Sequence, residues 1–115
     1  MKRPDILRNQ RDFDRLHLKG NSSGSKYVVL LSIKNGLTYN RKAFVASKKV
    51  GNSVQRNRAR RLMRESYRSL EDSMPLGFDY IFIARATIND SKCADVKKSI
   101  EAAAKRTLLL MLVWN

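Results

Sequence analysis

The stretch GNSVQRNRARRLMRESYR, residues 51–68, combines a helical hydrophobic pattern with six arginines and a single acidic residue. On a helical wheel stepping about 100° per residue, a packing stripe forms around Ala59. Its other members are Leu62, Met63, Ser66, Tyr67 and Leu70. The opposite side carries Asn57, Arg60, Arg61, Arg64 and Arg68. The stretch therefore predicts an amphipathic helix from Val54 to about Asp72, begun by a turn and cap at residues 51–53.

The cationic side of this predicted helix favours a polyanionic ligand. A solvated helix face usually mixes charges, but only Glu65 offers a partner to these arginines. Like charges one turn apart repel by about a few tenths of a kcal/mol per pair, and bound phosphates would offset that repulsion. Arginine also suits phosphate, because its planar guanidinium contacts two oxygens at once. An ordinary solvated face remains the alternative.

The whole chain has the same charge bias. It has 115 residues, 43% of them hydrophobic, with a formal net charge of +14. This length and composition predict one domain, residues 1–115, whose charge favours nucleic acid first and an acidic membrane surface second. The single cysteine, Cys93, suits a reducing cytoplasm. The longest apolar run, 108–114, is shorter than the roughly 18 residues that span a bilayer, so we expect a cytoplasmic protein without a membrane partner.

The remaining elements are predicted from periodicity and turn residues. A short helix over residues 10–18 follows Asn9, and strands are expected over 26–34, 43–47 and 78–84. Residues 21–24 read as a turn, with a short edge strand beside it as the alternative. A final helix after residues 89–91 places one apolar face along Val96, Ile100, Ala103, Ala104, Leu108 and Met111. The sum is an α+β sandwich of helices against one sheet, whose strand–helix–strand crossover would be right-handed by default.

A family resemblance adds detail to this prediction. The segment KKVGNSVQRNRARRLMRESYR, residues 48–68, closely resembles the signature of the protein subunit of bacterial ribonuclease P, which centres on Arg-Asn-Arg, here Arg56, Asn57 and Arg58. The segments RPDILRNQRDFDRLHLKG and DYIFIAR resemble the first helix and last strand of that family. The resemblance implies a fold like the second domain of ribosomal protein S5: a single-domain two-layer sandwich ordered α-β-β-β-α-β-α. Its sheet has four strands, it has three helices, and its crossover is left-handed.

The resemblance also implies two RNA-binding regions. The catalytic RNA would meet the arginine helix and the loop before it, at Lys48, Lys49, Asn52, Arg56, Asn57, Arg58, Arg60, Arg61, Arg64 and Arg68. The single-stranded 5′ leader of precursor tRNA would lie in a cleft between the first helix and the sheet, lined by Phe13, His17, Lys26 and Tyr27. Aromatic faces beside cations suit an unpaired strand. His17 stands where relatives carry an aromatic ring, so stacking and a half-exposed packing role stay equally open. Tyr27 has a core alternative, and Lys26 could be an ordinary edge-strand lysine.

The sequence offers no protein active site for phosphodiester hydrolysis. Such a site needs clustered carboxylates holding metals or a histidine pair, but the chain has one histidine and scattered acids. The resemblance implies instead that the RNA cleaves, using Mg²⁺, while the protein binds no cofactor of its own. The resemblance therefore leads us to expect that this chain is the protein subunit of ribonuclease P, the endoribonuclease that removes the 5′ leader of precursor tRNA. We expect one protein to bind one RNA subunit.

Two other classes of protein remain as alternatives. A structural ribosomal protein is also small and basic, but would predict a basic terminal extension. A DNA-binding regulator would need a base-reading helix of mixed polar residues, usually on a dimer. The arginine-rich face here is more typical of contacts to a phosphate backbone.

Overall fold

The computed structural model describes residues 5–114, with side chains described as far as residue 107. Within this range the α-helices are α1 (Gln10–Lys19), α2 (Ser53–Leu70) and α3 (Cys93–Trp114). The strands are β1 (Asn21–Gly24), β2 (Val28–Lys34), β3 (Arg41–Val45) and β4 (Phe78–Ala84). Two short 3₁₀ helices, η1 (Glu71–Ser73) and η2 (Ala86–Asp90), flank β4. The expected α-β-β-β-α-β-α order is confirmed, including the weak first strand.

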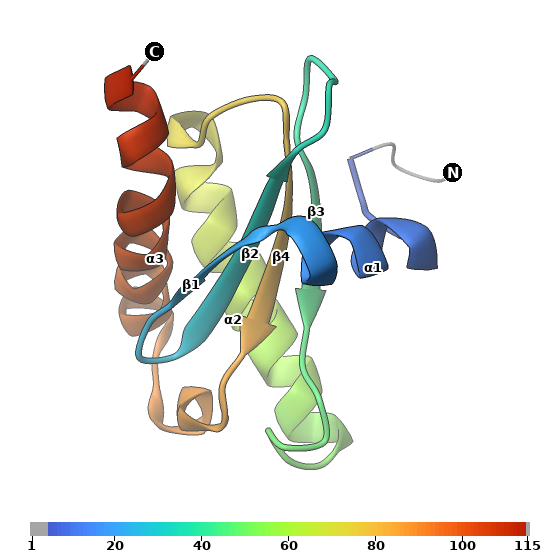
Figure 1. Ribbon diagram of the computed structural model, residues 1–115. Coiled ribbons are helices and arrows are strands. Elements are labelled where there is room, and N and C mark those ends of the chain that lie inside the picture. The colour runs from blue at the N-terminus through green and yellow to red at the C-terminus, as the bar shows by residue number, and fades with distance from the viewer. Residues whose placement is uncertain (1–4, 115) are drawn as a thin grey trace.

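The four strands form one mixed sheet in the order β1-β2-β4-β3. β1 pairs antiparallel with β2, and β2 antiparallel with β4, whereas β3 and β4 are parallel. In Figure 1, β3 and β4 both run downward with β3 to the right, and α2 connects them behind the sheet. This path is a left-handed crossover. The family-based expectation therefore holds, and the general right-handed rule fails for this chain.

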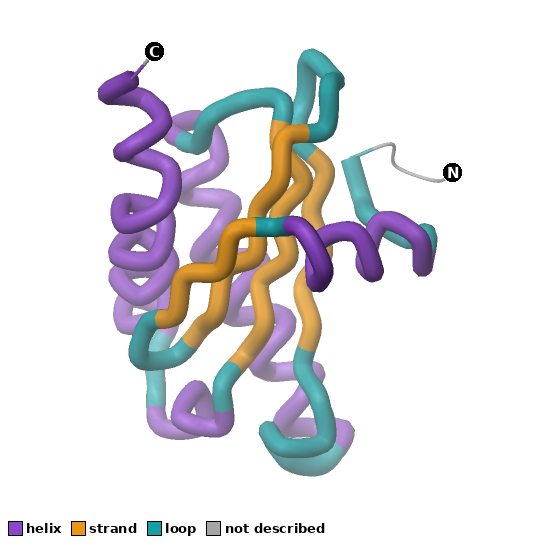
Figure 2. Tube along the Cα trace, viewed as in Figure 1, coloured by secondary structure: helices purple, strands orange, loops and turns teal. Residues whose placement is uncertain are grey.

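Helices cover the sheet on both faces but unequally. Figures 1 and 2 show α2 and α3 side by side behind the sheet, while the shorter α1 crosses its front. The rear face holds the larger core, in which the side chains of Met63, Tyr67, Tyr80, Phe82 and Ile100 are almost wholly buried. The front face holds a smaller cluster around Leu7, Leu16, Leu31, Ala43 and Ile81. Because α1 is short, part of the front face stays accessible.

Two strand boundaries differ from the sequence expectation. The first long strand begins at Val28 rather than Lys26, because the chain bends at Lys26 and Tyr27 after leaving β1. The next strand runs from Arg41 to Val45, two residues earlier at each end than expected. Only the first of these shifts affects a candidate site, since it changes the direction of Tyr27.

The predicted helix faces agree with the structure. In α2 the buried residues are Ala59, Met63, Ser66 and Tyr67, which all lie on the expected packing stripe. In α3, Val96, Ile100 and Ala103 are buried, while the side chains of Leu108 and Met111 lie outside the described residues. The 3.6-residue period was sufficient to orient both helices.

Candidate nucleic-acid interface

The loop before α2 is held in a fixed conformation that starts the helix. Gly51 has φ +142°, a value that side-chain-bearing residues rarely adopt, and a Cβ there would collide with Gln55. Asn52 then caps the helix: its side chain accepts from the Gln55 backbone N–H, and the Gln55 side chain accepts from that of Asn52. This reciprocal capping box sets the direction in which α2 leaves the loop. Lys48 and Lys49, just before it, are both exposed.

The cationic face of α2 points away from the core. Arg61, Arg64 and Arg68 are exposed and follow one another at spacings of three and four residues, so they line one side of the helix. The Arg64 guanidinium lies 5.9 Å from the ring centre of Phe44, a cation–π contact. The packing of Ala59 and Met63 holds this row of cations in place.

The side chains of two further arginines of α2 form hydrogen bonds within the helix or with the loop before it. Arg56 donates from Nη1 to the Gly51 carbonyl at 3.0 Å, and so reinforces the capped turn. Arg60, which the helical wheel placed toward solvent, is only half-exposed and donates to the Asn57 side chain. Both retain further guanidinium donors, so each can still contact a phosphate.

Arg58 has a different environment from the rest of the motif. Its Nη2 donates to the Ser91 carbonyl at 2.6 Å, and its Nη1 donates to the Ile88 carbonyl at 3.3 Å. These carbonyls belong to η2 and the residue that ends it. The guanidinium of Arg58 thus joins α2 to the segment between β4 and α3. This structural role was not visible in the sequence, where Arg58 looked like any other member of the cationic motif.

A second candidate surface lies on the front of the sheet, beside α1. Register pairs Val29 of β2 with Ile83 of β4, and Ile83 with Val45 of β3. These three side chains are only half-buried and pack, like half-buried Phe13, against the smaller core. The neighbouring row of Leu31, Ile81 and Ala43 is buried instead. We refer to Phe13, Val29, Val45 and Ile83 as the front groove surface; strand alternation could have identified its three aliphatic members.

The expectation that Tyr27 shares this surface with Phe13 is wrong. Tyr27 packs against the larger core on the rear of the sheet, whereas Phe13 packs against the front cluster. The cause is the bend before β2: Tyr27 does not continue the alternation of the strand, which would have directed it to the side of Val29. Lys26 lies with Tyr27 and not with Phe13, since its ammonium is 5.3 Å from the centre of the Tyr27 ring.

His17 lies at the exposed side of α1. Its Nδ1 is 2.8 Å from the Phe13 carbonyl one turn earlier, and the side chain is exposed. His17 is thus not a core residue, and both stacking on a base and a half-exposed packing role stay open.

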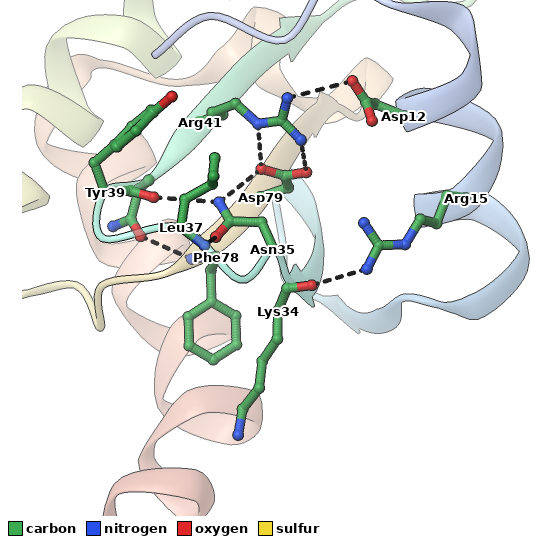
Figure 3. A network of polar contacts seen from close by, with 10 residues as sticks. Asp12, Arg15, Lys34, Asn35, Leu37, Tyr39, Arg41, Phe78 and Asp79 are labelled. Carbon is green, nitrogen blue, oxygen red and sulfur yellow. Dashed lines mark hydrogen bonds and ion pairs between the residues drawn. The ribbon is translucent and has the colours of Figure 1, made fainter. Parts of the chain in front are cut away.

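A polar network fixes the position of α1 against the sheet (Figure 3). Arg41 donates from Nε and Nη2 to the two carboxylate oxygens of buried Asp79, at 2.9 and 2.7 Å. The same guanidinium reaches Asp12 of α1 at 3.4 Å, and Asn35 donates to Asp79 at 2.9 Å. The hydrogen bond to Asp79 raises the pKa of Arg41, so this group stays charged at any physiological pH. The network thereby links α1, β3 and β4 beside the front groove surface.

Comparison with known proteins identifies the family. The ribonuclease P family model matches residues 1–108. The chain belongs to the ribonuclease P protein family. It is 38% identical to the ribonuclease P protein component of Pelotomaculum thermopropionicum, covering 92% of this chain and 95% of that relative. It is 39% identical to that of Clostridioides difficile, covering 88% and 90% of the two chains.

Solved structures of ribonuclease P proteins share this fold. The Staphylococcus aureus protein superposes with a TM-score of 0.81 at 29% identity, covering 92% of this chain and 97% of that one. The Thermotoga maritima protein gives 0.79 at 31% identity, covering 88% and 96%. Membership of this family assigns the chain to tRNA processing within a ribonucleoprotein. In the part of the chain that the structure describes, no helix is long and apolar enough to cross a membrane.

Proposed function

We propose that this chain binds the catalytic RNA of ribonuclease P through α2 and the loop before it, and the 5′ leader of precursor tRNA through the front groove surface. The observation that carries the first part is the row of exposed Arg61, Arg64 and Arg68 on a capped helix with a buried opposite face. Guanidinium groups at this spacing can contact successive phosphates of a folded RNA. Exposed Lys48 and Lys49 extend the same charge along the loop.

The two surfaces are continuous along the chain. Val45 ends β3 on the front groove surface, and the loop carrying Lys48 and Lys49 follows directly. An unpaired leader that stacks on Phe13 and the exposed ring of His17 could therefore lie next to the catalytic RNA bound at these lysines. Because only the precursor has a leader, this arrangement would favour precursor over mature tRNA.

The proposal gives the chemistry to the RNA subunit, with Mg²⁺ held by the RNA, and gives the protein binding and orientation. The side chains on both surfaces are cations, amides and hydrophobic groups, which neutralise phosphates and stack on bases. Hydrolysis by the protein would require carboxylates or imidazoles placed to activate water. Within the described residues, no group of three or more His, Cys, Asp or Glu side chains could hold a metal ion.

The α2 part of the proposal is tested by binding of ribonuclease P RNA as a function of salt. Arg61→Ala combined with Arg64→Ala should weaken binding and lower the salt slope by about one unit for each lost phosphate contact. The control is Lys34→Ala combined with Lys97→Ala, which removes the same charge elsewhere. Equal losses for the two double variants would mean that binding reflects net charge and not α2.

The leader part is tested on the reconstituted complex with precursor and mature tRNA. Phe13→Ala should weaken precursor binding by about 1–3 kcal/mol, the range for one base–aromatic stack, and leave mature tRNA binding nearly unchanged. A purely structural Phe13 would instead weaken both ligands alike. Cleavage of precursor tRNA by RNA-free protein, surviving nuclease treatment of the preparation, would overturn the assignment of chemistry to RNA.

A further inference from the structure

A hollow of about 350 Å³ opens on the rear side of the molecule, between the bend before β2 and α3. Its walls include Ser25, Lys26 and Tyr27 from the bend, and Lys98, Ser99 and Arg106 from α3. Tyr27 packs on the rear core and Phe13 on the front cluster, so the hollow is separated from the front groove surface by the sheet. It also contains none of the α2 arginines.

The bend that forms one wall is held by hydrogen bonds from two other segments, α3 and the start of η2. Ser99 of α3 is 6% exposed; its hydroxyl contacts the Ser25 hydroxyl and accepts from the Tyr27 backbone N–H at 3.1 Å. Arg85 donates to the Ser25 carbonyl at 2.9 Å, and Thr87 donates to the Lys26 carbonyl. These bonds fix the backbone that carries Tyr27, and the Tyr27 side chain packs against the rear core, which gives it the support that a stacking surface requires.

The charges around the hollow favour an anion. Three cations, Lys26, Lys98 and Arg106, line the hollow, together with one carboxylate, Asp95. The Asp95 carboxylate accepts a hydrogen bond from the Lys92 backbone N–H at 2.9 Å. Lys98 and Arg106 are eight residues apart, which corresponds to about 12 Å along a helix axis. Their long side chains can reach phosphates on both sides of a group seated between them.

We propose that this hollow binds one unpaired nucleotide of RNA, with its base against Tyr27 and its flanking phosphates against Lys98 and Arg106. The Lys26 ammonium lies 5.3 Å from the ring centroid, and a base that stacks on Tyr27 would take the place of this ammonium. The combination of a fixed aromatic ring and surrounding cations is how proteins hold single-stranded RNA. The inference does not rest on the α2 proposal, because its test uses the free protein and a short oligonucleotide.

The test is an amide chemical-shift titration of the full chain with pentauridylate, with uridine monophosphate and inorganic phosphate as separate arms. Pentauridylate should shift the amides of residues 25–27 and 98–102. Lys98→Ala combined with Arg106→Ala should weaken the affinity read from these amides about tenfold, the range for charge-assisted contacts. Both side chains are exposed, so the variant is expected to fold.

The matched control is Lys34→Ala combined with Lys97→Ala, which removes two positive charges outside the hollow. Its affinity at the same amides should fall by no more than about twofold, through the general loss of charge. Tyr27→Leu, which keeps apolar packing, should weaken pentauridylate more than inorganic phosphate. The proposal is overturned if the control loses as much as the test variant, or if phosphate alone shifts these amides as strongly as the oligonucleotide.

Discussion

Arg58 and Arg61 lie within one turn of α2, yet their guanidinium groups have different surroundings. Arg58 is half-buried and donates to two backbone carbonyls of a neighbouring segment, whereas Arg61 is exposed. A buried carbonyl that loses its hydrogen-bond donor keeps the free-energy cost of its desolvation. When an exposed arginine is removed, water takes over its hydrogen bonds and no such cost arises. One motif therefore contains residues that hold the fold and residues that are available to RNA.

This difference predicts that Arg58→Ala destabilises the protein. The expected loss is about 1–3 kcal/mol in the free energy of unfolding, because the Ser91 carbonyl would lose the Arg58 donor. The Ile88 carbonyl would keep its bonds from the Ser91 backbone N–H and hydroxyl and adds little to this loss. Urea denaturation followed by circular dichroism measures it. Arg61→Ala is the matched control and should change stability by less than about 0.5 kcal/mol. If both variants have the same midpoint, Arg58 does not contribute to the fold as its contacts indicate.

Asp79 provides a second prediction at the residue scale. It is 1% exposed and accepts from Arg41 and Asn35. Asp79→Asn should cost about 3 kcal/mol, because half-buried Arg41 loses its carboxylate partner and a buried amide would turn a donor toward the donors of Arg41 and Asn35. Asp14→Asn, an exposed change on α1, serves as the control and should be nearly neutral. Thermal unfolding of the two variants makes the comparison, and a neutral Asp79→Asn would show that the network in Figure 3 adds no stability.

At the scale of the element, α2 depends on both its faces. Its packing face supplies stability: Met63 is 0% exposed, whereas Leu62 beside it is half-buried. Its cationic face has Glu65 as the single acidic partner within α2, and its capping box fixes the start of the helix. The helix is thus a rigid support for the arginines. The free energy gained by burying its opposite face outweighs the repulsion between their charges.

We expect Met63→Ala to cost about 2–5 kcal/mol, since it removes a fully buried side chain and leaves a cavity. Leu62→Ala should cost clearly less, because part of that side chain already contacts water. Chemical denaturation measures both values. A larger loss of stability for Leu62→Ala than for Met63→Ala would indicate that α2 turns a different face toward the core.

At the scale of the whole molecule, the sheet separates candidate RNA-binding surfaces that the net charge of the chain does not distinguish. The chain carries 24 basic and 10 acidic residues. The front groove surface beside α1 and the hollow beside α3 lie on opposite sides of the sheet, and α2 presents its arginines from the rear layer. A protein of this shape can contact RNA from more than one direction.

The rear core also predicts how stability depends on pH. Burial raises the pKa of Tyr67 and of Tyr80, because a phenolate would lose its hydration. A raised pKa in the folded state means that this stabilisation is complete below the unfolded value near pH 10 and is lost as pH rises further. The free energy of unfolding should therefore fall above about pH 10 by up to roughly 1.4 kcal/mol per pH unit for each tyrosine.

Urea denaturation at successive pH values between neutral and strongly alkaline measures this decline. Tyr80→Phe, which loses the hydrogen bond to the Pro75 carbonyl, should start from lower stability but show a shallower decline. A stability that is independent of pH across this range would contradict the burial of both hydroxyl groups.

Local sequence by itself determined most elements of this protein and the composition of its cationic helix. Helical periodicity placed Ala59, Met63 and Tyr67 in the core and Arg61, Arg64 and Arg68 outside it. A turn and cap at residues 51–53 were readable because capping depends on residues only a few positions apart, and the structure assigns the cap to Asn52. The Arg-Asn-Arg motif and its flanks pointed to the family for the same reason, since they form one continuous segment.

Only the tertiary structure decided which side chains share a surface. The direction of Tyr27 depends on a bend fixed by Ser99, and the partners of Arg58 come from η2 and the residue after it; both contacts join residues far apart in the chain. The strand order, the left-handed crossover and the pairing of Arg41 with Asp79 likewise arise from contacts between distant segments. Sequence periodicity specifies which face of an element is buried. The packing of elements against one another then determines what that face meets.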